Sequence, residues 1–128
     1  MADNVIIQPV LHYRDPDKAL RFLTDAFGVE EKAVHRDPDG NVAYVEAALG
    51  GCAFGFGRTA EGGSPFDLGP TAVYVALDEV DSMHQRAAGA GAEVVMPPTD
   101  QDYGSRDFAA RDLEGNVWCF GTYRPGSS

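Results

Sequence analysis

Three histidines are the side chains of this chain best suited to bind a metal ion or to transfer a proton near neutral pH. His35 is expected at the end of a strand and His84 on a helix among polar neighbours, so both are predicted to be solvated surface residues. His12 follows Gln8 by four residues on a predicted strand, and alternation places both side chains on one face of the sheet. Contact with a ligand and a structural hydrogen bond to the backbone both remain open for His12.

Two cysteines and one acid complete the set of reactive candidates. Cys52 and Cys119 each fall inside a predicted strand, and they are expected to be reduced core residues rather than a disulfide. The chain has no CxxC-type metal spacing. Glu46 lies in an interior strand and could act as a ligand or a base, but we interpret it as a solvent-facing acid.

Length and composition predict one soluble domain. The chain has 128 residues, of which 44% are hydrophobic and 23% are charged. No apolar run reaches the roughly 20 residues of a membrane helix, and Met1 to Asn4 lacks the features of a signal peptide, so we expect a cytoplasmic protein without a membrane partner. The formal net charge of −10 opposes nucleic acid binding. It indicates either a solubilising surface or an acidic surface that attracts a cationic small molecule.

The first half of the chain predicts a β-α-β-β-β unit over residues 5–58. A strand over Val5 to Tyr13 leads to Asp15-Pro16, an N-cap followed by proline at the first helical position, and the helix ends at Gly28. The apolar residues of this helix keep the period of an α-helix, so one face is expected to pack on a sheet. Strands over 29–36, 41–49 and 52–58 complete the unit.

The same order returns over residues 71–123, after a linker at 59–70 that is rich in glycine, proline and polar residues. A strand over 71–77 precedes a helix that Asp78 is expected to cap and that ends at Gly89-Ala90-Gly91. A strand over 92–96 is expected to end at Pro97-Pro98. Strands over 105–111 and 117–123 then form a hairpin around the turn at 112–116.

Two sequence similarities bear on whether this unit is duplicated. Gly51 to Gly57 matches Gly115 to Gly121 position for position, which sets a fixed offset between the two halves of the chain. RDPDGNV at 36–42 is similar to RDLEGNV at 111–117, but these two segments are further apart than the glycine-led pair, so this likeness reflects shared turn chemistry and not the repeat. The predicted fold class is α+β, with a single domain over 1–128 made of two β-α-β-β-β repeats.

A doubled β-α-β-β-β unit of this size resembles the vicinal-oxygen-chelate superfamily, which includes glyoxalase I, the extradiol dioxygenases and the bleomycin-resistance proteins. The likeness covers essentially the whole chain. It is carried by Pro9-Val10-Leu11, Ala26-Phe27-Gly28 and, most specifically, Gly104 to Asp112 followed by Glu114-Gly115-Asn116, which favour the bleomycin-resistance type. The resemblance implies curved mixed sheets around a cleft that holds a metal ion or an organic ligand and closes within one chain or across a dimer. The fold alone does not decide between these functions.

Enzymes of this superfamily bind a metal ion through four His, Glu or Gln side chains, taken from the first and last strands of each unit. The family spacing assigns these positions here to Gln8, Gly55, Ala72 and Cys119. Glycine and alanine provide no donor atom, and glutamine with one cysteine is a poor set for the usual divalent ions. We therefore expect no metal, no cofactor and no catalytic residue at this site.

Small side chains at these positions leave room for a ligand. The predicted cleft residues are Gln8, His12, Gly55, Ala72, Tyr74, Tyr103, Arg106 and Cys119. Aromatic faces with a few polar groups suit a flat or cationic organic molecule. For Tyr74 and Tyr103, core or interface packing is an equally open alternative, and Trp118 is expected to face the helix because it alternates out of phase with Cys119.

The resemblance implies a homodimer that sequesters a drug-like small molecule, as antibiotic-binding relatives do. A second hypothesis is a glyoxalase I-like lyase or a dioxygenase-like enzyme, which would need a general base and a polarising ion. A third is a domain with no small ligand.

Overall fold

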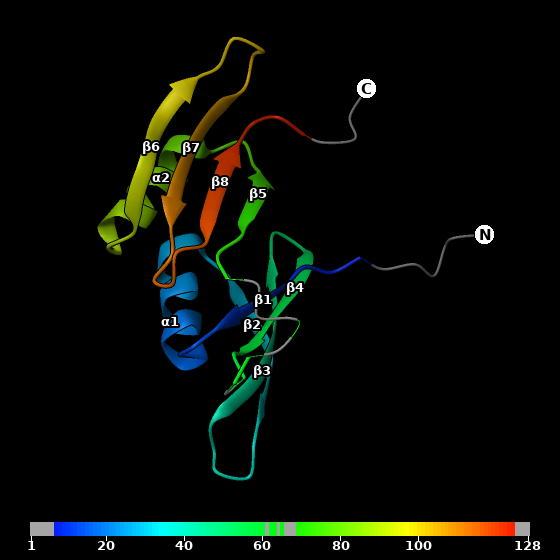
Figure 1. The fold of residues 1–128 in the computed structure, drawn as a ribbon. Coiled ribbons are helices and arrows are strands. Elements are labelled where there is room, and N and C mark those ends of the chain that lie inside the picture. Colours follow the sequence, from blue (N-terminus) through cyan, green and yellow to red (C-terminus); the bar gives the residue numbers. More distant parts are fainter. Residues whose placement is uncertain (1–6, 61, 64, 66–68, 125–128) are drawn as a thin grey trace, which may run out of the picture.

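The structure, a computed structural model, describes residues 7–60, 62, 63, 65 and 69–124. These residues form two four-stranded sheets, each covered on one face by a helix (Figure 1). The first repeat contributes β1 (Val10–Tyr13), α1 (Pro16–Phe27), β2 (Glu30–Arg36), β3 (Val42–Leu49) and β4 (Cys52–Arg58). The second contributes β5 (Ala72–Ala76), α2 (Val80–Gly89), β6 (Glu93–Asp100), β7 (Arg106–Arg111) and β8 (Val117–Gly121). The predicted α+β class with two β-α-β-β-β units is confirmed.

Strand pairing shows that the two repeats share one register. The sheet orders are β1-β4-β3-β2 and β5-β8-β7-β6, and in each sheet the first pair is parallel while the other pairs are antiparallel. Val10 lies opposite Gly55, and Tyr74 lies opposite Cys119. Tyr74 follows Val10, and Cys119 follows Gly55, by the same number of residues that separates the two matching glycine-led segments. The duplication therefore extends to the position of single residues.

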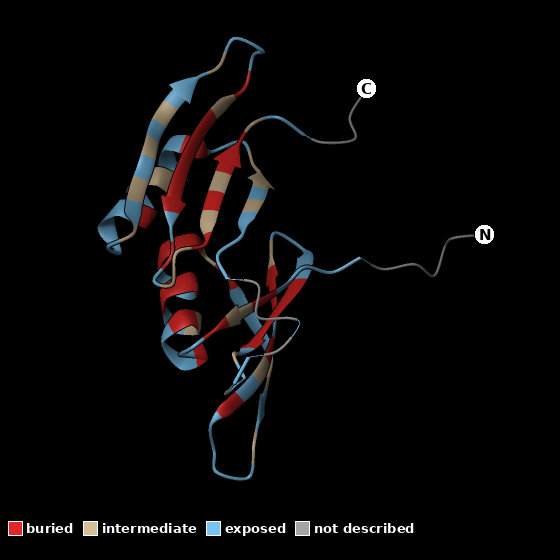
Figure 2. Cartoon of the chain, in the orientation of Figure 1, coloured by how far each residue is buried: buried red, intermediate tan, exposed pale blue. Residues whose placement is uncertain are grey.

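Helix α1 lies at the centre of a hydrophobic core that both repeats share. Asp15 caps it by accepting a hydrogen bond from the Lys18 backbone N–H at 3.1 Å, as predicted. Gly28 ends it at φ +77°, a left-handed conformation that favours glycine. The Phe27 ring packs against Trp118 and Phe120 of β8, with centroids 5.2 and 5.0 Å apart. Trp118 faces the helix, as predicted, and Figure 2 shows α1, β7 and β8 among the most buried elements.

The turn between β7 and β8 fastens the second repeat to the first through Asp112. This buried carboxylate accepts hydrogen bonds from the Tyr13 hydroxyl at 2.6 Å and from the Trp118 indole N–H at 3.1 Å. It also accepts from the backbone N–H groups of Glu114 and Asn116, at 3.0 and 3.1 Å. Burial and the charge of Asp112 raise the pKa of Tyr13, so the hydroxyl keeps its proton and remains a donor.

The similar turn at 37–41 has the same internal chemistry, and within the part of the chain that the structure describes Asp37 makes no hydrogen bond to the second repeat. Asp37 accepts from the backbone N–H groups of Asp39 and Asn41, at 2.9 and 3.0 Å. This confirms that the likeness of the two heptapeptides reflects turn geometry.

Both ends of α1 are bound by side chains of the second repeat. The Glu114 carboxylate accepts from the backbone N–H groups of Arg14 and Asp15 at 2.7 and 2.9 Å. At the other end, the Arg86 guanidinium donates to the carbonyl oxygens of Thr24 and Asp25 at 3.0 and 3.1 Å. An acid at the N-terminus and a base at the C-terminus match the sign of the helix dipole.

Three local predictions about the elements are wrong. Strand β1 begins at Val10, because Pro9 has no N–H to continue the ladder, while Val5 and Ile6 lie outside the described residues. Helix α2 has Glu79 at its N-cap without a side-chain cap bond. Asp78, the predicted cap, pairs instead with Arg124 at 3.2 Å.

Strand β6 continues through both prolines to Asp100 instead of ending at them. It is an edge strand with register shifts on either side of Met96, so the missing N–H groups remove no necessary ladder bond. No helix in the described part of the chain is long and apolar enough to cross a membrane.

Replacing Asp112 with asparagine should destabilise the protein by roughly 2–4 kcal/mol, because the amide cannot accept from all the donors that converge on the carboxylate. Urea unfolding followed by circular dichroism measures this difference. Asp37→Asn is the matched control, because Asp37 has the corresponding place in the similar turn at 37–41 of the first repeat. This substitution should lower the free energy of unfolding by only about 0.5 kcal/mol. Equal losses in the two variants would show that Asp112 acts only within its own turn.

Candidate functional site

The face of the first sheet that points away from α1 carries a small polar group centred on Gly55. The Gln8 amide donates to the Tyr44 hydroxyl at 3.2 Å. That hydroxyl lies in the space that a Cβ at Gly55 would need, with the Gln8 amide nitrogen beside it. Gly55 is therefore required for close approach of these side chains, and it supplies no group of its own.

His35 and Glu46 lie on the same face and form a hydrogen bond of 2.8 Å between Nε2 and Oε2. Their side chains are 59% and 54% exposed, so both are solvent-facing as predicted, although they act as a pair. His84 differs from its prediction as a solvated residue. Its ring is partly buried and packs edge-on against Phe108 of β7, with centroids 5.3 Å apart.

The four positions assigned to metal ligands do not provide a suitable donor set. Gln8 lies beside Gly55 and is engaged with Tyr44, while Ala72 and Cys119 lie on neighbouring strands of the other sheet. Glycine and alanine cannot coordinate an ion, and no group of three or more His, Cys, Asp or Glu suited to a metal occurs among the described residues. The residues present do not fit the metal of the superfamily's enzymes.

On the second sheet, a buried carboxylate gathers hydroxyl groups on the face away from α2. Asp107 of β7 accepts from the Tyr103 hydroxyl at 2.9 Å and from the Ser105 hydroxyl at 2.5 Å. It lies opposite Gly121 of β8, and a Cβ there would meet both the Asp107 carboxylate and the Tyr74 hydroxyl. Tyr74 donates to the carbonyl oxygen of Tyr123 at 2.6 Å.

The charge of Asp107 influences three neighbouring acidic groups. The hydrogen bond to Asp107 raises the pKa of Tyr103. Burial, followed by the charge of Asp107, raises the pKa of Tyr74 and of Cys119. Each of these three groups therefore keeps its proton to a higher pH than usual.

Arg106, predicted to line the cleft, lies on the opposite face of β7. Its guanidinium donates to Asp81 of α2 at 3.0 Å and to Asp100 of β6 at 3.0 Å. Strand alternation explains the correction, because Arg106 precedes Asp107 by one residue and so points toward the helix.

The two cysteines are free thiols, as predicted, but neither is a core residue. Cys52 is exposed at the start of β4, and Cys119 is partly buried beside Tyr74.

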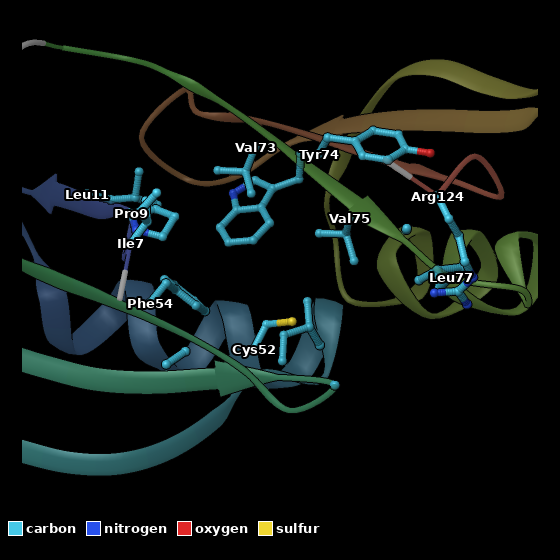
Figure 3. A pocket seen from close by; sticks show the side chains of 15 residues that line it. Ile7, Pro9, Leu11, Cys52, Phe54, Val73, Tyr74, Val75, Leu77 and Arg124 are labelled. Atoms are coloured by element: carbon cyan, nitrogen blue, oxygen red, sulfur yellow. The ribbon is translucent and has the colours of Figure 1, made fainter. Parts of the chain in front are cut away.

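Two grooves of about 470 and 450 Å³ run along β5, the inner edge of the second sheet. The larger is mostly apolar, and Figure 3 shows Cys52 and Phe54 on one side of it and Val73, Val75 and Leu77 on the other. The smaller groove contains His12, Ala72 and Tyr74. Tyr74 lines both grooves, and the smaller groove brings His12 of the first sheet beside Ala72 and Tyr74 of the second. Cys119 lies opposite Tyr74, and Tyr103 is bonded to Asp107 near the Tyr74 hydroxyl, whereas Gln8 and Gly55 of the first sheet line neither groove.

Sequence reasoning did not identify Tyr44, Ser105 and Asp107 as site residues. Asp107 could have been found by pairing the predicted hairpin strands, since the register places it opposite Gly121. The position of Tyr44 over Gly55 depends on the packing of three strands and has no local sequence signal.

The sequence model of the Glyoxalase/Bleomycin resistance protein/Dioxygenase superfamily matches residues 6–120, and the chain belongs to this superfamily. An uncharacterized protein of Mycobacterium bovis is 30% identical over an alignment of 131 positions, which covers 94% of this chain and 86% of that protein. TioX from Micromonospora sp. ML1 has a crystal structure that matches with a TM-score of 0.78 and 29% identity, over 93% of this chain and 100% of that one. The fosfomycin resistance protein FosX from Mesorhizobium loti matches with a TM-score of 0.66 over 95% and 94% of the two chains, and at 14% identity it shows the fold alone.

Cys119 should react slowly with thiol reagents near pH 8, since its raised pKa keeps the thiolate scarce until higher pH. The pH dependence of labelling in Cys52→Ser, which leaves Cys119 as its one thiol, measures that pKa. Adding Asp107→Asn should lower the midpoint, because one cause of the shift is the charge of Asp107. A midpoint in Cys52→Ser at or below the ordinary value for a thiol, about 8.5, would contradict this assignment.

Proposed function

We propose that this protein binds a small organic molecule and sequesters it without converting it. The observation that carries the proposal is the pair of grooves that share Tyr74 on a scaffold whose metal-ligand positions hold glycine and alanine. Apolar walls with a few polar groups are typical of small-molecule sites.

Titration with a panel that includes bleomycin-like and mitomycin-like compounds tests this function. Saturation at one ligand per chain, without consumption of the compound, is the expected result. Trp118 borders the larger groove and provides a fluorescence signal, and calorimetry supplies the stoichiometry. Absence of saturable binding across the panel would contradict the proposal.

Ala72→Trp should weaken binding by at least about tenfold, because an indole at this exposed position fills the smaller groove. Ala90→Trp adds the same ring at an exposed site after α2 and should leave the affinity unchanged. The ratio of the two dissociation constants is the measurement. A ratio near one would place the ligand elsewhere.

The proposal includes a homodimer. Among the described residues, no strand of one sheet lies against a strand of the other, so the two open faces do not close over each other within the chain. The apolar groove between β1 and β5 offers a surface for a second copy.

Light scattering should give twice the mass of a single chain. Val75→Lys, in the groove, should favour monomers, and Val95→Lys, exposed on β6, should not. A monomeric wild type would contradict this part.

A lyase is the second candidate, and the His35–Glu46 pair is the observation that favours it. A histidine held by a carboxylate at 2.8 Å can act as a general base beside the Gly55 region. Conversion of the hemithioacetal of methylglyoxal, abolished by His35→Gln, would support the lyase and overturn sequestration.

A further inference from the structure

Asp107 is a buried carboxylate without a cationic partner in the described part of the chain. The residue is 4% exposed, and its oxygens accept there from the neutral hydroxyls of Tyr103 and Ser105. No ion pair to Asp107 is found in the described ranges. A buried charge without a counter-charge is unfavourable compared with a neutral group of the same shape.

A purely structural role would not require this charge. The Ser105 hydroxyl accepts from the backbone N–H of Tyr123 at 3.1 Å and donates its proton to Asp107, which ties the loop before β7 to the end of β8. The two hydroxyls donate to different oxygens of Asp107. An asparagine could accept from Ser105 through its carbonyl oxygen and donate its amide N–H to Tyr103, whose exposed hydroxyl can act as an acceptor instead. The negative charge at this position therefore needs another explanation.

Two tyrosines approach the carboxylate through their hydroxyl groups. The Tyr103 hydroxyl is hydrogen-bonded to Asp107. The Tyr74 hydroxyl would lie 2.7 Å from a Cβ atom at Gly121, and the Asp107 carboxylate would contact the same atom, so the two groups are close to each other. The ring of Tyr123 lies 6.5 Å from that of Tyr74. Tyrosine faces together with a carboxylate attract ammonium groups through cation–π and charge interactions.

The carboxylate can be uncovered without disturbing the core. Tyr103 is 69% exposed, so a change of its side-chain rotamer would free one Asp107 oxygen while the ring stays near by. Tyr74 connects this point to both grooves, which gives space for the uncharged body of a ligand.

We infer that the cationic group of the ligand, a protonated or quaternary nitrogen within or attached to a flat aromatic body, binds at Asp107 between the rings of Tyr74 and Tyr103. This inference rests on the proposed function and specifies its ligand class. The net charge of −10 would raise the concentration of any cation near the protein. The higher affinity for a cation than for its neutral analogue is assigned to Asp107.

A matched pair of probes tests the inference by calorimetry. 9-Aminoacridine is cationic at pH 7, whereas acridine has nearly the same shape and is neutral. The wild type should bind the cation at least about tenfold more tightly, a preference expected for a hydrogen-bonded charge pair. Asp107→Asn should bring the two dissociation constants to within about twofold of each other.

Two controls separate Asp107 from general acidity. Asp102→Asn removes an exposed acid from the same loop and should keep the preference. Ionic strength of about 0.5 M should also keep it, because a buried pair is screened less than surface charges. Loss of the preference in either control would assign it to the surface field and overturn the inference.

Two further variants keep the test independent of folding. Asp107→Asn should unfold at the same or a higher temperature than the wild type, and a marked fall would show that the charge is structural. Tyr103→Phe should keep the preference for the cation, and Tyr103→Leu should reduce it about threefold, by loss of the ring. If both acridines bind equally to the wild type, the inference fails and the sequestration proposal stands. If neither they nor the panel compounds bind, both fail.

Discussion

The buried carboxylate of Asp112 is the interaction on which the arrangement of the two repeats depends. It joins the Tyr13 hydroxyl of the first repeat to the Trp118 indole of the second and completes the turn that carries Glu114. A buried carboxylate is tolerated when its oxygens are hydrogen-bonded, so these contacts support one another. Through Glu114 the same turn holds the start of α1, and the helix in turn packs under β8. The position of each open sheet face follows from this one network.

Most of the fold could be predicted from the sequence because its signals are local. The cap at Asp15, the stop at Gly28 and the fixed offset of the glycine-led segments can be read along the chain, and all are found in the structure. Errors occurred where tertiary context decided. Pro97 and Pro98 sit within a strand because β6 is at an edge, and Asp78 leaves its cap position to pair with Arg124.

The candidate site could be predicted only in part, for a physical reason. Strand alternation predicts which face of a sheet a side chain occupies, and the structure pairs the strands that carry Ala72, Tyr74 and Cys119, with Tyr74 opposite Cys119. Alternation could not show that Asp107 is buried and that Arg106 points toward α2. The burial of Asp107 depends on the Tyr103 and Ser105 hydroxyls that donate to its carboxylate. Such convergence involves loops and strands far apart in sequence.

The edges of the two sheets differ in what they expose. The outer strands carry devices that discourage further strand pairing: charged residues on β2, such as Glu30 and Lys32, and two prolines on β6. The inner strands β1 and β5 have the sequences VLHY and AVYVA. They contain no Asp, Glu, Lys or Arg and no proline. Unwanted polymerisation is thus discouraged on the outside of the molecule, while its inner borders keep backbone groups available for an ordered partner. Charges and prolines on the outer strands oppose growth into open-ended fibres, whereas the inner strands leave an edge at which two copies can pair and close.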